Sequence, residues 1–233
     1  MTDTLPPIPE TDDEVEVLAP GTIVAIVDPL CGWCWGAAPA LARIAASGAV
    51  PFEILASGLF IGGRPMSPDF ADYAWKNDCR IRDLTGQTFS DAYREKVLGN
   101  FDTTIDSGPA TLAFAAVQLH EPEKALTALH ALQAARWVDG RDITSETVCA
   151  EVLREIGCGE ATVAAYLAED EAVIDLLNQR AELARNLMRH VEARGVPTLI
   201  RIVETGVEKI DGRHLFEDAE NIVVHVAGAQ GTA

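Results

Sequence analysis

The sequence lacks the long apolar run of a membrane protein and the basic surplus of a nucleic-acid-binding protein. No stretch approaches the roughly 18 consecutive apolar residues that a membrane helix needs. Lys and Arg number 18 against 36 Asp and Glu, which gives a formal net charge of −18. A chain of this charge is poorly suited to a phosphate backbone. We therefore expect neither a membrane nor a nucleic-acid partner.

The N-terminal region lacks the features of a secretory signal. Residues 1–20 contain four prolines and a run of acidic residues, with no basic segment and no apolar segment. This composition is typical of a loosely packed tail. We expect a flexible acidic tail over residues 1–20 and a cytoplasmic protein.

Cysteines are few and unevenly spaced. Their number, five, is odd, which does not indicate a disulfide framework in a chain without a secretory signal. Only one C-x-x-C pair is present, whereas a closed zinc site needs four ligands. The other cysteines are isolated and the histidines are scattered: Cys79, Cys149, Cys158, His120, His130, His190, His214 and His225. We expect no metal site and three single, buried cysteines; a second redox pair among them is the less favoured alternative.

The C-x-x-C pair, Cys31 and Cys34, lies between a predicted strand and a predicted helix. Ile23–Val27 is a short apolar run rich in β-branched residues, the pattern of a strand that is buried on both faces. An alanine-rich stretch with apolar periodicity follows the pair and stops at Gly48, as a helix with a glycine cap would. Cys31 and Cys34 are therefore expected to open this helix.

The start of a helix favours thiol chemistry at the first of these cysteines. The first turn offers unpaired backbone N–H groups and the positive end of the helix dipole, both of which stabilise a thiolate. We expect Cys31 to be the nucleophile and Cys34 to resolve a mixed disulfide on it. Half of a zinc site, two buried structural thiols and a static disulfide remain alternatives.

The residues around the pair resemble a known family. A strand, a C-x-x-C at a helix start and a proline five residues later, Pro39, are similar to the thioredoxin fold. The run DPLCGWCWG resembles more narrowly the DsbA-like branch. Within that branch it is similar to the predicted protein-disulfide isomerases of the FrnE type, which are related to 2-hydroxychromene-2-carboxylate isomerases. The resemblance covers about residues 22 to 226.

The two ends of the chain fit an α/β thioredoxin fold. Val50–Ala56 predicts a second strand, parallel to the first. Thr198–Glu204 and Val207–Ile210 predict a terminal hairpin, and Glu217–Ala227 predicts a closing helix.

The middle of the chain shows helical periodicity and no strand signal. The predicted helices are Asp69–Cys79, Ser90–Leu98, Pro109–His120, Pro122–Asp139, Ser145–Ile156 and Asp170–Arg194. We therefore expect a DsbA-like thioredoxin fold with a large all-helical insertion between the second and third strands. The expected domains are a thioredoxin-like domain at 21–61 and 195–228 and a helical insertion domain at 62–194.

Val196 and Pro197 form the second motif that the resemblance singles out. In the thioredoxin fold, a proline preceded by a small or β-branched residue stands opposite the active cysteine, with its peptide bond cis. The resemblance thus places Pro197 next to Cys31 and gives the Val196 backbone a role in binding an extended substrate. An ordinary trans proline at the entrance to a strand is the alternative.

Three further residues near the motif allow two interpretations each. Asp28, at the end of the predicted strand, either accepts a proton during thiol exchange or caps the loop. Trp33 and Trp35 either form an apolar rim that binds substrate or pack in the interior.

These observations predict a thiol–disulfide oxidoreductase or disulfide isomerase, with thiols or disulfides of proteins or small molecules as partners. We expect no bound cofactor, a redox-active disulfide, glutathione as a possible co-substrate, and a monomer or homodimer. Related isomerases and kappa-type glutathione transferases carry a serine at the nucleophile position, whereas this chain has Cys31. A glutathione-dependent isomerase or transferase is the principal alternative, and a non-catalytic binding module is the third.

Overall fold

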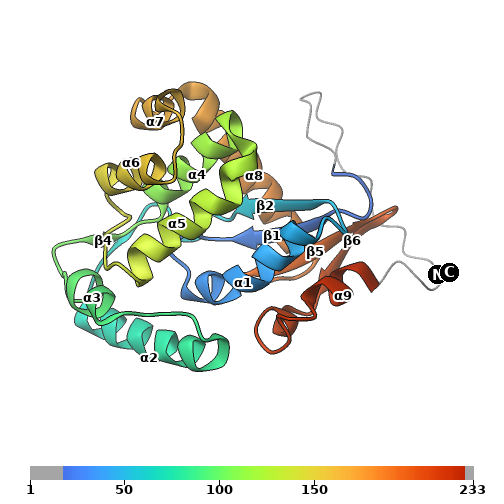
Figure 1. The fold of residues 1–233 in the computed structure, drawn as a ribbon, viewed down its shortest axis with the longest axis horizontal. Coiled ribbons are helices and arrows are strands. Elements are labelled where there is room, and N and C mark those ends of the chain that lie inside the picture. The colour runs from blue at the N-terminus through green and yellow to red at the C-terminus, as the bar shows by residue number, and fades with distance from the viewer. Residues whose placement is uncertain (1–17, 229–233) are drawn as a thin grey trace.

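The computed structural model describes residues 18–228, and a four-stranded sheet lies in the middle of the molecule (Figure 1). The strands are β1 (Ile23–Val27), β2 (Phe52–Ala56), β5 (Thr198–Val203) and β6 (Gly206–Ile210), in the order β2-β1-β5-β6. β1 is parallel to β2 and antiparallel to β5, and β5 and β6 form an antiparallel hairpin. The predicted parallel pair and terminal hairpin are therefore confirmed. The flexible tail expected at 1–20 falls mostly outside the described residues.

Helices make up most of the remaining structure. They are α1 (Gly32–Ser47), α2 (Pro68–Thr85), α3 (Asp91–Tyr93), α4 (Gly108–His120), α5 (Ala125–Trp137), α6 (Glu146–Glu155), α7 (Glu160–Leu167), α8 (Glu171–His190) and α9 (Ile222–Ala227). Short π- and 3₁₀-helical segments lie at Arg94–Leu98, Pro122–Lys124 and Gly212–Leu215. Within residues 18–228, no helix has both the length and the apolar character to cross a membrane.

The sheet is covered on both faces because β1 alternates its side chains between two apolar cores. Ile23, Ala25 and Val27 share a cluster with the buried residues of α1 and α9. Val24 and Ile26 share a second cluster with α8. All five residues of β1 are fully buried, as the continuous apolar run predicts.

The helices between the second and fifth strands pack mainly on one another. α4 is central to them, since it contacts α5, α6, α7 and α8 (Figure 1). Its small residues allow this close approach, and Ala110, Ala113 and Ala116 are fully buried. Trp137 lies in the same apolar cluster, where its ring stacks on Trp35. The strand order and the helices inserted between β2 and β5 are those expected of a thioredoxin fold with a helical insertion.

Some helices and strands differ from those predicted, both in the inserted region and at the C-terminal end. The segment 62–194 contains two short paired strands, β3 (Arg64–Pro65) and β4 (Thr104–Ile105), because a pairing of two residues leaves no alternating pattern in the sequence. Helix α7 was not expected. The closing helix is shorter than predicted, since it begins at Ile222 rather than at Glu217.

Candidate active site

The C-x-x-C pair opens helix α1, as the sequence predicts. Cys31 is the N-cap residue, with an extended backbone, and Cys34 lies in the first turn. Both are free thiols. The exposed fraction is 8% for Cys31 and 1% for Cys34, so any partner must reach Cys31 first.

Cys34 is held as a protonated thiol. Burial, followed by the hydrogen bond and the charge of Cys31, raises the pKa of Cys34 well above its usual range. The backbone N–H of Asp28 points to its sulfur, with 3.4 Å between N and Sγ. Cys34 can therefore become a nucleophile only if a nearby group accepts its proton.

Asp28 supplies a buried carboxyl group next to Cys34. Its Oδ1 accepts from the Leu30 N–H at 2.9 Å, and its Oδ2 accepts from the Ser107 hydroxyl at 3.1 Å and the Phe60 N–H at 3.4 Å. Burial raises the pKa of Asp28 to about 6, although these hydrogen bonds act in the opposite direction. The group caps the loop, and its charge also raises the pKa of Cys34. Its role as a proton acceptor stays a prediction.

Val196 and Pro197 lie against Cys31, although 165 residues separate Val196 from Cys31 in the chain. The Cys31 thiol donates to the Val196 carbonyl oxygen, with 3.5 Å between Sγ and O. The Val196–Pro197 peptide bond is cis. An open cleft of about 520 Å³ begins at Pro197.

This cleft carries an excess of positive charge. Its walls include three basic side chains, Arg194, Lys209 and Arg213, and one acidic side chain, Asp211. Asp211 is paired with Arg213, with 2.6 Å between Oδ2 and Nη2. Two cations are therefore left over in the cleft that begins at Pro197, in a protein whose net charge is −18.

The two tryptophans of the motif point to different environments. Trp33 is half-buried and packs edge-on against Phe216, with 5.2 Å between ring centroids. Trp35 is buried in the helical core, where its indole N–H donates to the Thr88 carbonyl oxygen at 3.0 Å. Trp33 thus lies beside the cysteines, whereas the expectation that Trp35 belongs to a substrate-binding rim is wrong.

The sequence analysis missed a second buried carboxyl group at the motif, Asp78 of α2. Its Oδ1 lies 2.5 Å from the position that a Cβ on Gly32 would occupy. Its Oδ2 accepts from the Tyr93 hydroxyl at 2.9 Å, and the charge of Arg136 also acts on it. Burial raises the pKa of Asp78 to about 7. The helical spacing of Asp78 to the buried Ile81 was the available signal, because residues three apart share a face.

The expectation of three buried single cysteines holds for two of them. Cys149 and Cys158 are buried, and the Cys149 thiol donates to the Ile143 carbonyl oxygen at 3.2 Å. Burial raises the pKa of Cys149 to about 12, so its thiol is unreactive. Cys79 is only half-buried, contrary to expectation.

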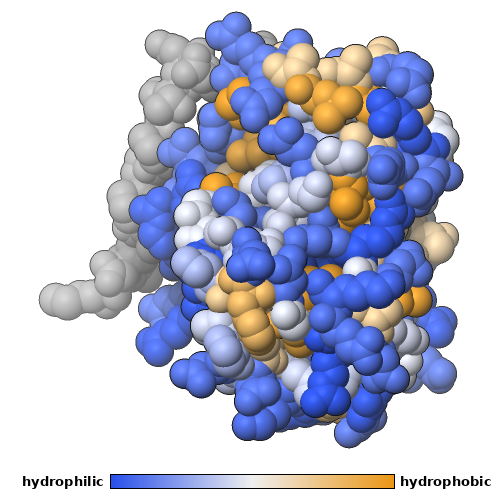
Figure 2. Space-filling view, turned by 90° about the vertical axis from the view of Figure 1, so that its left-hand side faces the viewer, coloured by the Kyte–Doolittle hydropathy of each residue, from blue (hydrophilic) through white to orange (hydrophobic). Residues whose placement is uncertain are grey.

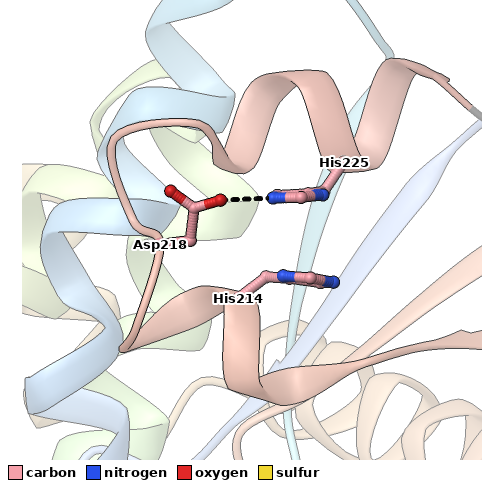
Figure 3. A group of neighbouring side chains, drawn as sticks. All are labelled: His214, Asp218 and His225. Carbon is pink, nitrogen blue, oxygen red and sulfur yellow. Dashed lines mark hydrogen bonds and ion pairs between the residues drawn. The ribbon is translucent and has the colours of Figure 1, made fainter.

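The histidines are not all scattered, which corrects another expectation. His214 and His225 stack face to face, and Asp218 lies beside them (Figure 3). The chain reverses between Leu215 and Ile222, and such a reversal gives no periodic signal in the sequence.

The chain matches a known protein family over most of its length. Residues 22–218 match the family described as the DSBA-like thioredoxin domain. No curated protein matches the chain in sequence. Among solved structures, the cytosolic disulfide reductase DsbM from Pseudomonas aeruginosa is 28% identical, with a TM-score of 0.79 over 89% of this chain and 98% of that chain.

Two further structures extend the comparison. DsbM has also been solved with glutathione (GSH); that structure, again 28% identical, matches with a TM-score of 0.77 over 89% of this chain and 98% of that chain. A 2-hydroxychromene-2-carboxylate isomerase is 15% identical, with a TM-score of 0.59 over 91% of this chain and 100% of that chain. At 15% identity, the similarity to the isomerase shows a shared fold only.

Proposed function

Because this chain belongs to the DSBA-like thioredoxin domain family, we propose that it is a thiol–disulfide oxidoreductase with Cys31 and Cys34 as its redox pair. The observation that carries the proposal is the arrangement of the two thiols at the start of α1. Cys31 is the more exposed thiol, whereas Cys34 is buried, protonated and adjacent to Asp28. This is the asymmetry that an attacking and a resolving cysteine require.

The reaction proceeds through two exchanges. The Cys31 thiolate attacks one sulfur of a substrate disulfide, which breaks the substrate S–S bond and releases one substrate thiolate that takes up a proton. A mixed disulfide now joins Cys31 to the substrate. Cys34 loses its proton to Asp28 and attacks the Cys31 sulfur, so that the second substrate thiol leaves. The substrate is reduced by two electrons and the Cys31–Cys34 pair is oxidised.

The surroundings of Cys31 support binding of an extended partner. The Val196 carbonyl oxygen faces the sulfur, and backbone groups at this place can pair with a substrate chain. Trp33 adds an apolar surface on the side of Phe216. On the face shown in Figure 2, by contrast, hydrophilic residues predominate and apolar residues form small separate groups, which gives no support to a holdase on that side.

We propose the direction of reduction, with glutathione as the electron donor. Two glutathione molecules would reduce the Cys31–Cys34 disulfide and leave as glutathione disulfide, which balances the two electrons given to the substrate. Glutathione carries two carboxylates, and the cleft at Pro197 offers Arg194 and Lys209 beyond the Arg213–Asp211 pair. The likeness to DsbM, named a cytosolic disulfide reductase and solved with glutathione, supports the same direction. A cytoplasmic location and a monomer or homodimer remain predictions.

The glutathione-dependent isomerase or transferase is the second candidate, because the same basic cleft would hold glutathione in either reaction. The two differ in what Cys34 does. An isomerase has no resolving step, whereas the reductase cannot complete its reaction without Cys34.

An insulin-reduction assay, run with and without glutathione, tests the proposal. We expect turnover that glutathione sustains, a loss of about a hundredfold or more for Cys31→Ala, and unchanged turnover for Cys79→Ala as the matched control. Equal activity of Cys31→Ala and the wild type would overturn the proposal. Glutathione-dependent isomerisation of 2-hydroxychromene-2-carboxylate without reduction of insulin would favour the second candidate.

A further inference from the structure

Three side chains of the C-terminal segment lie close together. His214 lies in the 3₁₀ turn Gly212–Leu215, Asp218 lies in the connection that follows and His225 belongs to α9 (Figure 3). Each offers one ligand atom, and these atoms all lie within 4.8 Å of one another. His225 Nε2 is 2.7 Å from Asp218 Oδ2, and the imidazole rings of His214 and His225 stack with 3.7 Å between centroids.

From this geometry we propose that His214, Asp218 and His225 bind a divalent transition-metal ion of the Zn²⁺ type. Two imidazole nitrogens and one carboxylate oxygen are the donor set that suits Zn²⁺, Co²⁺ and Ni²⁺, whereas Mg²⁺ and Ca²⁺ prefer oxygen donors alone. Three protein ligands leave the fourth position of a tetrahedral ion to water.

Small side-chain movements complete the site. Zinc lies about 2.0–2.2 Å from nitrogen and oxygen ligands, so its ligand atoms stand about 3.3 Å apart. At 2.7 Å the Asp218–His225 pair is closer than this, so these two atoms would move apart by about 0.6 Å as the metal takes the place of the proton between them. His214 closes the remaining gap by a rotation of its ring, which its half-buried position permits.

The surroundings of the three residues favour a cation. Asp218 Oδ1 accepts from the Asn221 side-chain amide at 2.8 Å, which orients the carboxylate and leaves Oδ2 for the metal. The nearby Arg213 is neutralised by Asp211. The side chains of His225 and Asp218 are 30% and 38% exposed, so the ion can enter from solvent.

The proposed site is connected to the redox motif by one residue. Phe216 lies between His214 and Asp218 in the chain, and its ring packs on Trp33. A bound ion would therefore fix the segment that forms one side of the motif. The site does not depend on the proposed function, because none of its ligands takes part in thiol exchange.

Calorimetric titration with Zn²⁺ tests the proposal on protein whose accessible thiols have first been alkylated with iodoacetamide. Alkylation is needed because the Cys31–Cys34 thiols would themselves bind Zn²⁺. We expect one ion per chain, and affinity lowered about tenfold or more in His214→Ala, His225→Ala and Asp218→Asn. His120→Ala, which removes an exposed histidine elsewhere, is the matched control and should bind as the wild type does.

Co²⁺ provides a second measurement that needs no substitution. On the alkylated wild-type protein, Co²⁺ should broaden the imidazole proton resonances of His214 and His225 and leave those of His120 and His190 sharp. Its absorption should lack a thiolate-to-cobalt charge-transfer band. Unchanged Zn²⁺ affinity in His214→Ala and His225→Ala, or broadening confined to other histidines, would overturn the site.

Discussion

Two buried carboxyl groups lie against the redox motif, and they come from different parts of the fold. Asp28 follows strand β1, accepts three hydrogen bonds at its carboxylate and donates its backbone N–H to the Cys34 sulfur. Asp78 comes from α2, accepts one hydrogen bond from Tyr93 and touches the backbone of Gly32. Burial raises the pKa of both, to about 6 and about 7. Because Asp28 contacts Cys34 whereas Asp78 contacts residue 32, we expect Asp28 to take part in thiol exchange and Asp78 to position the motif.

The largest expected effect is on the rate at which Cys34 resolves the mixed disulfide, and it should differ between Asp28 and Asp78 variants. Asp28→Asn should slow the resolving step about a hundred- to a thousandfold at pH 7, because Cys34 then lacks a proton acceptor. Asp78→Asn, the matched control, should change the rate by less than about threefold. Rapid-mixing kinetics of the decay of a mixed disulfide measures this step. Equal rates for the two variants would contradict the role of Asp28 as the proton acceptor of Cys34.

The pH dependence of the same step follows from the pKa of Asp28. Below about pH 6 the group is protonated and cannot accept the Cys34 proton, so the wild-type rate should fall as pH decreases from 7 to 5. Asp28→Asn should lose this inflection. An unchanged inflection near pH 6 in the variant would assign it to another group.

The next effect concerns stability and Asp78. Its pKa is raised from 3.8 to about 7 in the folded state, so the folded protein binds more protons than the unfolded chain between these values. Its contribution to the free energy of unfolding is therefore fully present below about pH 4 and is lost as pH rises to about 7. Between pH 5 and 8 the wild type should lose about 2–3 kcal/mol more than Asp78→Asn. Urea denaturation at both pH values measures the difference, and parallel pH profiles would contradict it.

A smaller effect is expected at the contact between Asp78 and the motif. Gly32→Ala places a Cβ 2.5 Å from Asp78 Oδ1, which should cost about 1–3 kcal/mol of stability. Asp78→Ala should relieve part of this cost in the double variant. Gly228→Ala is the matched control, since nothing lies within 4 Å of its added Cβ. If the two single glycine substitutions have the same denaturation midpoint, the contact does not constrain residue 32.

The smallest effect concerns the only side-chain hydrogen bond that Asp78 accepts among the described residues. Tyr93→Phe removes a hydroxyl donor at 2.9 Å from Asp78 and should cost about 1 kcal/mol. It should also raise the pKa of Asp78 further, because this hydrogen bond lowers it. Tyr73→Phe, at a residue that is 65% exposed, is the control. Thermal unfolding at several pH values measures the pH at which stability falls as Asp78 loses its proton. We expect this pH to be higher in Tyr93→Phe and unchanged in Tyr73→Phe.

The sequence predicts well those features that depend on residues close together in the chain. The buried strand Ile23–Val27 and the helix start at Cys31 follow from local pattern, and the resemblance adds Pro197 as their distant neighbour. The spacing of Asp78 to Ile81 indicates a buried face, but its contact with Gly32 could not be predicted, because the residue of α2 that meets Gly32 depends on how the inserted helices fold back. Trp33 and Trp35 face different environments since residues two apart on a helix point in nearly opposite directions.

The measurement that tests the central claim most directly is a non-reducing gel of Cys34→Ala from cells, with disulfide reductase activity followed in parallel. If Cys31 attacks and Cys34 resolves, this variant should accumulate partner proteins or glutathione on Cys31 and lose turnover, whereas Cys31→Ala should trap little. If Cys34→Ala accumulates no mixed disulfide and keeps full activity, Cys34 is structural and the oxidoreductase account is contradicted.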